Sequence, residues 1–460
     1  MPRPSSNEHG QLFPTRRILT IAAVAIAVAL TALTAARVLR RLANMWQWEI
    51  DCPRNWPLSM FSLKIPGIHE PIAHAGIAAA IGVVFFVLIR WQLVRIIERR
   101  WLVLAFGGLL VLSTNLIHGP THGLARPHGD EKQYYRDASQ VTSTARFLEE
   151  FNARQPQLGC HARTHPPGAV LLFHGLCLSL GTPEAVSIAV ALVAVGLTGL
   201  FFHGLLTYDF DRQTCGYVTL LLLLVPSVQI YYCTTLDAII AGCFLAVLYF
   251  IRHPHSAVSI GGATVGLICA SMLTFGACFL GPVLVGIELF TRRSPWRTTA
   301  ALTGTALFYI ALHMATGFDY LQAFRTASAL ENPGGFLLLT EPASYFLTRL
   351  ENLADIVWYF GPFLLVLSIR GIRLLRSTRS HPEVLATTVL GLLTLAAMFL
   401  SGAFRTGETA RACLFIVPYL MLPVAAYLQH RSCTMHDKRA LAWLVFGQTL
   451  AMQTFGGYYW

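Results

Sequence analysis

Residues 126–140 gather ionisable side chains directly after an apolar run, residues 101–117. Asp130 and Glu131 are adjacent and follow a glycine. Histidines flank this pair on both sides: His118, His122 and His128 before it, His161 and His165 after it. A carboxylate in this position suits a general base that takes a proton from a hydroxyl, or an oxygen ligand of a divalent cation such as Mg²⁺ or Mn²⁺. A hydrated loop acid explains the pair equally well, and the residues alone leave all three readings open.

Two further polar residues stand where apolar segments begin. His165 is followed by Pro-Pro-Gly, and proline suits the first turn of a helix, where its missing N–H is harmless. Asp237 opens another apolar segment soon after Pro226, at a position where the helix dipole favours an acid. A plain helix start accounts for either residue. Either also suits the lining of a polar site at the membrane surface.

A third group of charges lies late in the chain. Arg405, Glu408 and Arg411 are spaced by three, so successive pairs would be neighbours on a helix. They enter an otherwise apolar segment, where charged side chains are costly and usually functional. Arginine suits bidentate binding of phosphate. An internal Glu–Arg ion pair is the alternative explanation.

The composition predicts a membrane protein. Of the 460 residues, 55% are hydrophobic and 12% are charged, whereas soluble domains carry about 25% charged residues. The formal net charge is +11. Because the basic residues cluster at the ends of apolar runs, they are typical of topology-marking loops and not of nucleic-acid binding. The 10 cysteines form no CxxC motif, so the sequence gives no sign of a zinc or redox centre.

Apolar runs define the candidate helices. Since a span needs roughly 20 apolar residues, we expect an all-α polytopic protein with about 11–14 transmembrane helices. The predicted segments are residues 18–39, 73–92, 101–117, 168–181, 184–206, 214–232, 236–251, 258–275, 277–291, 298–316, 352–370, 383–402, 411–428 and 440–457.

Basic residues predict the orientation, because Lys and Arg concentrate in cytoplasmic loops. Basic groups lie at residues 16–17, 90–100, 292–297, 370–379 and 430–439, and we expect all of them on the cytoplasmic side. Residues 42–72, 118–167, 318–351 and the turn 403–410 then face outward. Cys52 and Cys160 lie in two of these outer loops, and a disulfide between them would require an oxidising compartment.

Residues 167–206 conflict with a simple alternation of sides. Loop 118–167 is expected outside and residues 209–212 inside, so an odd number of crossings must separate them. Yet this region contains two apolar segments divided by Gly-Thr-Pro at residues 181–183. Either the first segment is a re-entrant or outer-leaflet element, or the assignment of Arg212 to the inside is wrong.

The loop 118–167 also shows helical periodicity. Apolar residues recur at steps of four and three, while charged residues occupy the other faces; the apolar positions are Tyr134, Ala138, Val141, Ala145 and Leu148. This pattern predicts an amphipathic helix that lies on the membrane interface.

Taken together, these motifs resemble those of the GT-C superfamily of integral-membrane glycosyltransferases, and in particular its protein-O-mannosyltransferase and aminoarabinose-transferase-like branch. The resemblance spans roughly residues 101–430. The family has an acidic motif in its first large outer loop, usually after the first helix; here two extra apolar segments precede it. The matching motifs are Gly129-Asp130-Glu131, His165-Pro166-Pro167-Gly168, Pro226…Asp237 and Gly407-Glu408-Thr409-Ala410-Arg411.

The resemblance implies transfer of a sugar from a polyprenyl-phosphate donor to a hydroxyl of a lipid, glycan or protein acceptor, with inversion. It implies an extracytoplasmic site in a bacterial inner or plasma membrane. Asp130 would be the general base, and Glu131 would position the acceptor or a divalent cation. The residues implied for the donor sugar or phosphate are His165, Asp237, Arg405, Glu408 and Arg411.

We expect three parts of the chain: an N-terminal tail with two extra spans in residues 1–100, a catalytic membrane core in residues 101–430, and a last span in residues 431–460. Two other classes of protein fit the composition. A transporter or flippase of lipid-linked sugars would show broken helices and repeated halves, and no repeat is visible. A non-catalytic envelope-assembly protein would use Asp130 only structurally.

Overall fold

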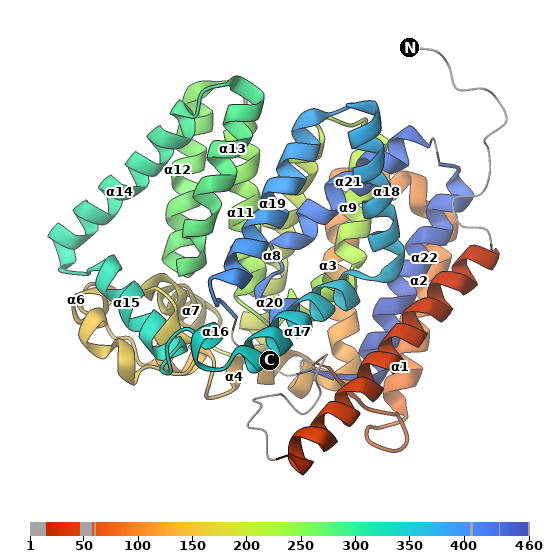
Figure 1. Cartoon of the computed structure of the whole chain (residues 1–460), viewed down its shortest axis with the longest axis horizontal. Helices are drawn as coiled ribbons and strands as arrows, with labels where there is room; N and C mark the ends of the chain where they lie inside the picture. The colour runs from red at the N-terminus through yellow and green to blue at the C-terminus, as the bar shows by residue number, and fades with distance from the viewer. Residues whose placement is uncertain (1–14, 47–57, 59–60, 405–407, 432, 459–460) are drawn as a thin grey trace.

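The computed structural model describes residues 15–46, 58, 61–404, 408–431 and 433–458. The described elements are helical apart from two short strands (Figure 1). The N-terminal half contains α1 (Thr15–Met45), β1 (Phe61–Leu63), α2 (Ala73–Glu98), α3 (Arg100–Asn115), η1 (Leu116–His118), η2 (Thr121–Ala125), α4 (Arg126–Gly129), α5 (Tyr134–Ser139), α6 (Thr144–Arg154), η3 (Gln155–Gln157), η4 (Ala162–Thr164), α7 (Pro167–Leu180), α8 (Pro183–Leu206), α9 (Arg212–Leu224) and α10 (Pro226–Tyr231).

The C-terminal half continues the same pattern of apolar helices joined by short turns. It contains α11 (Asp237–Arg252), α12 (Ser256–Leu273), η5 (Phe275–Phe279), α13 (Leu280–Arg292), α14 (Trp296–Thr316), α15 (Tyr320–Glu331), α16 (Leu337–Thr340), α17 (Pro342–Phe360), α18 (Pro362–Thr378), α19 (Pro382–Leu400), α20 (Thr409–Ala412), α21 (Ile416–His430), α22 (Met435–Phe455) and β2 (Gly456–Tyr458).

Among the described residues, 8 helices are long and apolar enough to cross a membrane, or up to 9 if the bent pair α17 and α18 is one span. The predicted all-α polytopic membrane architecture is therefore confirmed. The larger predicted number of spans also counted shorter apolar segments. Three of these, α9, α11 and α21, have 13, 16 and 15 residues and are almost completely buried. They form the core that the longer helices surround.

Two segments predicted as single helices are broken at proline. The segment 214–232 divides into α9 and α10 at Val225, because Pro226 has no N–H to continue the helical ladder. The segment 352–370 divides at Gly361, whose φ of 95° ends α17, and α18 leaves at an angle of 99°. The prediction of one helix over residues 352–370 is wrong, because Gly361 adopts a positive φ and Pro362 cannot continue the helical ladder.

The basic groups meet at one end of the helix bundle, which we call the basic face. Contacts between helix ends show that the segments next to these groups lie close together. The contacts are Arg212 with Glu98, Asp211 with Gln429, and Arg252 with Asp209 and Glu383. The connection between α13 and α14 lies at the same, upper end in Figure 1. The groups at residues 90–100, 292–297, 370–379 and 430–439 therefore share one face, as the charge pattern predicts, while no contact between described residues places residues 16–17 with them.

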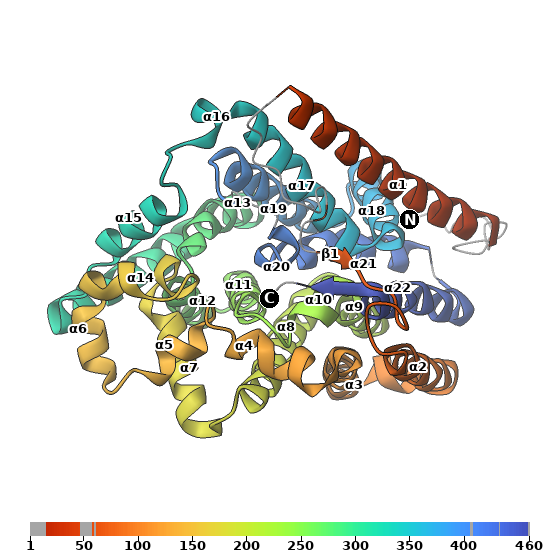
Figure 2. The same cartoon turned by 90° about the horizontal axis from the view of Figure 1, so that it is seen from below.

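The opposite end, which we call the loop face, carries α4–α7, α15–α17 and α20 (Figure 1, lower edge). Figure 2 looks onto this face, with α4, α10 and α20 near its centre and α17 further out. There β1 pairs antiparallel with β2, with Ser62 opposite Gly457. Cys52 lies outside the described residues, so its disulfide with Cys160 stays a prediction.

Helix α7 lies along the loop face and does not cross the bundle. Tyr135 of α5 donates a hydrogen bond of 2.7 Å to the carbonyl of Gly181, at the end of α7. Midway along α7, His174 Nδ1 lies 3.0 Å from the carbonyl of Ala138, also on α5. The middle and the end of α7 both contact α5. Of the two alternatives for residues 167–206, the structure therefore agrees with the one in which the first apolar segment is a re-entrant or outer-leaflet element. Helix α8 then makes the single crossing.

The amphipathic segment of loop 118–167 forms two helices, α5 and α6, and not the one that periodicity predicts. Ser143 starts α6 by accepting a hydrogen bond from the N–H of Arg146, as residues of this type do at helix starts. The break changes which residues face inward. Ala145 is exposed, and Phe147 and Phe151 are buried instead.

Candidate functional site

Arg411 is the centre of the candidate site. It lies on α20 at the loop face, and its side chain is only 8% exposed. Two carboxylates hold it: Asp237 Oδ2 lies 3.6 Å from Nε, and Glu408 pairs with Nη2. Asp237 is the first residue of α11, and Glu408 directly precedes α20. The cluster therefore joins two helix starts that are far apart in the sequence.

The guanidinium group of Arg411 keeps unused hydrogen-bond donors. The separation of 3.6 Å from Asp237 exceeds hydrogen-bonding distance. Within the described part of the chain, neither Nε nor Nη1 of Arg411 donates a hydrogen bond. An arginine has five N–H donors in a planar fork, so this one can still bind a second oxyanion such as phosphate.

The charges of the cluster support one another. Burial acts to lower the pKa of Arg411, but Glu408 and then Asp237 raise it above its ordinary value. Arg411 in turn is the main cause that lowers the pKa of Glu408. Glu408 and Arg411 are therefore both ionised at neutral pH. A bound phosphate would compete with these carboxylates for the spare N–H groups.

Two histidines border this cluster. His165 Nδ1 lies 2.9 Å from the carbonyl of His161. Burial, and then the charge of Arg411, lower the pKa of His161 to about 4. Burial also lowers the pKa of His165, although Asp237 opposes this shift. Both imidazoles are therefore neutral at pH 7, and each can donate one hydrogen bond and accept another.

Tyr134 and His161 belong to this site, and the sequence pattern did not identify either as a site residue. The Tyr134 ring stands perpendicular to that of His165 at 5.5 Å and stacks on Phe173 at 5.2 Å. Burial and then Asp237 raise the pKa of the Tyr134 phenol well above its usual value. The spacing of apolar residues places Tyr134 on an apolar helix face. Its polar hydroxyl group on that face is the sequence feature that could have identified it as a site residue.

Asp130 lies in a turn that adjoins the site, and the side chain of Glu131 is exposed. Asp130 ends α4, and its Oδ1 accepts a hydrogen bond of 3.0 Å from the N–H of Lys132. The carbonyl of Lys132 accepts the N–H of His161 at 3.3 Å, which ties this turn to the site. The Glu131 side chain is 87% exposed and lies 3.7 Å from Arg136. Arg405, also predicted for the site, lies outside the described residues.

The acidic pair does not fit a cation site in this arrangement. Asp130 turns its carboxylate onto its own backbone, and Glu131 extends toward Arg136. In the regions of the chain that the structure describes, no three His, Cys, Asp or Glu side chains group so as to hold a metal ion. A Mg²⁺ or Mn²⁺ ion therefore has no defined ligand set here, and no step proposed below depends on one.

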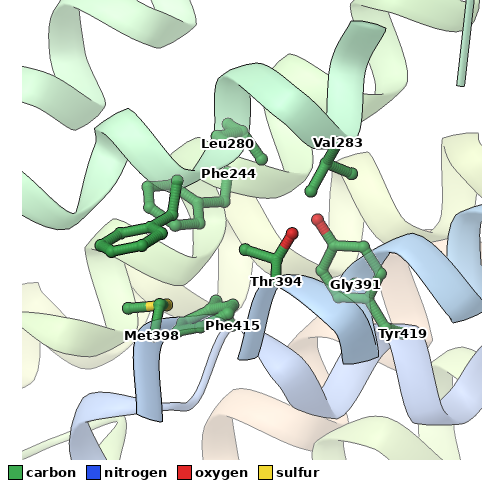
Figure 3. A pocket seen from close by; sticks show the side chains of 9 residues that line it. Phe244, Leu280, Val283, Gly391, Thr394, Met398, Phe415 and Tyr419 are labelled. Carbon is green, nitrogen blue, oxygen red and sulfur yellow. The ribbon is translucent and has the colours of Figure 1, made fainter. Parts of the chain in front are cut away.

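An apolar crevice lies deeper in the bundle and shares α11 with the charged cluster. Figure 3 shows its lining, which includes Phe244, about two turns along α11 from Asp237, and Phe415, four residues after Arg411 in the chain. The remaining lining residues are Phe279, Leu280, Val283, Gly391, Thr394, Met398 and Tyr419. Its cavity volume is about 10 Å³, room for about one water molecule. The crevice is thus a small apolar gap in the packing above the charged cluster.

No family model and no curated protein sequence matches the chain. Among solved structures, the chain is similar to the oligosaccharyltransferase of Archaeoglobus fulgidus, in a crystal structure with Zn and sulfate, with 14% sequence identity and a TM-score of 0.43. The match covers 78% of this chain and 53% of that one. It concerns the arrangement of the helices, and the chain spans about half the length of that enzyme.

Proposed function

We propose that the chain transfers a sugar from a polyprenyl-phosphate donor to an acceptor hydroxyl at the loop face. The observation that carries this proposal is the state of Arg411. It is a buried cation with unused donors, held by Asp237 and Glu408 where the helix bundle meets the loop layer. Such a group suits the phosphate of a donor whose tail stays in the bilayer. The motif order that resembles GT-C glycosyltransferases supports the same assignment.

The proposed reaction forms one bond and breaks one. The acceptor hydroxyl oxygen attacks the anomeric carbon of the sugar, and the bond from that carbon to the phosphate oxygen breaks with its electron pair. The hydroxyl proton passes to the Asp130 carboxylate, which acts as general base. Arg411 binds the departing polyprenyl phosphate, whose charge grows as the bond breaks. Attack opposite the leaving group inverts the anomeric configuration.

The membrane-spanning helices beside the cluster support a lipid-linked donor over a nucleotide sugar, because the hydrocarbon tail of such a donor is favourable in the bilayer. The crevice in Figure 3 has room for about one water molecule, so it is too small to hold that tail. The tail would therefore lie against the lipid-facing surface of the helices, with the phosphate at Arg411.

The neutral imidazoles of His161 and His165 would bind the sugar hydroxyls between donor phosphate and acceptor. The turn with Asp130 adjoins His161 through Lys132, which supports an acceptor that arrives from the rim. A lipid, glycan or protein hydroxyl fits this route equally. With the basic face in the cytoplasm, the site faces the outer side of a bacterial inner or plasma membrane.

The function can be tested by incubating the purified protein in lipid vesicles with a panel of radiolabelled polyprenyl-phosphate sugars. We expect label to appear in a glycosidic product or in free sugar by hydrolysis, and Asp130→Asn to remove most of this activity while insertion and folding persist. Transfer by Asp130→Asn at the wild-type rate would disprove the role of Asp130.

The same experiment separates this proposal from a lipid-linked-sugar flippase. A flippase would move label between vesicle leaflets without forming a glycoside. The bend between α17 and α18 is a feature that such transporters share. Label movement without a new glycosidic bond, across the whole donor panel, would reject the transferase.

A further inference from the structure

A row of polar residues on α17 contacts the segment that leads to Arg411. Tyr345, Arg349 and Asn352 are spaced by four and three, so they lie on one face of this helix. All three are buried, and Arg349 is 9% exposed. The opposite face exposes Phe346, Leu350, Leu353 and Val357. Helix α17 thus presents an apolar face outward and a polar face to the bundle.

Arg349 binds carbonyl oxygens. Its Nη1 donates to the carbonyls of Phe399 at 2.8 Å and Ala403 at 2.6 Å, and its Nη2 donates to that of Phe404 at 2.5 Å. Phe399 lies in the last turn of α19, where carbonyls lack helical partners and a cation is favourable. No ion pair recorded for the described residues includes Arg349. The residue is therefore used to fix the path of the backbone.

Asn352 extends this contact toward α20. Its Nδ2 donates to the carbonyl of Phe404 at 3.2 Å, and its own carbonyl accepts the hydroxyl of Thr409 at 2.9 Å. Phe404 has a φ of 61°, which is a costly backbone conformation for a residue with a side chain. The contacts from α17 hold this residue in place and then hold the first residue of α20.

Helix α20 cannot fix its own orientation. It contains 4 residues, and a single helical turn is unstable without tertiary contacts. The N–H of Arg411 bonds to the carbonyl of Glu408 at 3.1 Å, so the direction of the Arg411 backbone follows that of Glu408 and Thr409. The contacts of α17 at Phe404 and Thr409 are therefore in a position to set where the guanidinium group points.

We propose that Arg349 and Asn352 are positioning residues for the phosphate-binding Arg411. This inference rests on the proposed function for its effect on catalysis. Neither side chain contacts that of Arg411 among the described residues, so both act through the backbone. They hold the carbonyls of Phe399, Ala403 and Phe404 beside the point where α17 contacts Thr409. A shift of the leaving-group cation by even a fraction of an ångström weakens a stabilisation that depends on preorganised geometry. The effect falls on the bond-breaking step more than on donor binding.

The test uses Arg349→Lys, which keeps the charge and removes the planar fork, and Asn352→Ala, which removes one side-chain hydrogen bond and leaves the backbone contact with Thr409. Arg325→Lys is the matched control, because Arg325 is an exposed cation on α15. With radiolabelled undecaprenyl-phosphate sugars, we expect kcat of Arg349→Lys to fall about tenfold or more, with KM for the donor changing less than threefold. The kcat of Asn352→Ala should fall less than that of Arg349→Lys, and the kcat of the control should match that of the wild type.

A double variant shows whether Arg349 acts through Arg411. If it does, Arg349→Lys should cost little further activity in an Arg411→Lys background, because the geometry it maintains is already lost. A purely structural role predicts that the two losses multiply. Losses that multiply, or a kcat for Arg349→Lys equal to that of the wild type, would overturn the proposal.

Hydrogen exchange gives a readout that does not require transfer. In the wild type and in Arg349→Lys, exchange of the amides of residues 409–413 is measured by mass spectrometry, with unfolding temperatures recorded for both. We expect faster exchange in this segment and unchanged exchange in α12. Unchanged exchange at 409–413 overturns the positioning role even if transfer is found. If exchange is faster in Arg349→Lys but the wild type transfers no sugar, the positioning role is retained and the proposed function is rejected.

Discussion

Two buried arginines, Arg252 at the basic face and Arg411 at the loop face, differ in how completely their surroundings satisfy them. Arg252 donates to both oxygens of Asp209, at 2.7 and 3.2 Å, and to Glu383 at 2.6 Å. Its guanidinium carbon also lies 5.2 Å from the centre of the Tyr208 ring. Arg411 is equally buried, yet only Glu408 forms a hydrogen bond with its side chain in the described structure.

The neighbours of Arg252 show what a closed network does. Arg292 donates to the carbonyls of Ile251, Arg252 and His253, and Arg297 donates to that of His253, so the end of α11 is fully capped. Buried polar groups that are all paired fix a structure. Arg297 also keeps a buried Nε without a partner, so an unpaired Nε alone does not mark a binding site. What distinguishes Arg411 is that a single hydrogen bond from Nη2 holds its guanidinium group among the described residues, which is consistent with the phosphate binding proposed above.

The largest expected effect comes from Arg411→Lys. Lysine keeps the charge but cannot form the planar, two-pronged contact with phosphate. We expect transfer to fall by about 100-fold or more, the range found when one group that stabilises developing charge is lost. The measurement is the initial rate with radiolabelled polyprenyl-phosphate sugars, at equal amounts of folded protein. Arg252→Lys is the matched control at the other face and should transfer at the wild-type rate per folded molecule.

The reverse comparison concerns stability. Arg252→Ala leaves the carboxylate of Asp209, whose side chain is 9% exposed, without its partner. Breaking a buried ion pair in this way costs about 3–5 kcal/mol, so the unfolding temperature in detergent should drop strongly. Arg411→Ala should cost less, because Asp237 and Glu408 are 22% and 42% exposed and water can reach them. Equal losses in the two variants would contradict the division of roles.

The sequence predicted the helical membrane architecture well because apolar length and basic flanks act locally. It placed Asp237, Glu408 and Arg411 as candidates by chemical type, and these three do come together. It could not show that Tyr134 and His161 join them, since that depends on how α5 packs against α7. The sequence also does not predict the bend at Gly361, because a Gly-Pro pair inside an apolar run does not determine the angle between the helices on either side of it.

A smaller effect is expected from pH. The pKa of His161 is lowered to about 4 in the folded chain by burial and by Arg411, against an ordinary value of 6.5. Between these values the unfolded chain binds more protons than the folded one, so stability rises with pH and is lost as pH falls from 6.5 toward 4. The unfolding temperature should therefore decrease between pH 7 and pH 5. His161→Asn should make this decrease shallower, and an equal slope would show that His161 does not contribute.

The smallest effect is expected from Glu131→Gln, and it sharpens the contrast within the loop face itself. Glu131 and Asp130 are neighbours, yet Glu131 is 87% exposed and its ion-pair partner, Arg136, is 3.7 Å away. An exposed pair at this distance contributes about 0–1 kcal/mol. Transfer by Glu131→Gln should therefore stay within about twofold of the wild type, a change worth less than 1 kcal/mol in barrier height. Loss of activity in Glu131→Gln comparable to that in Asp130→Asn would mean that both carboxylates turn inward when donor and acceptor bind.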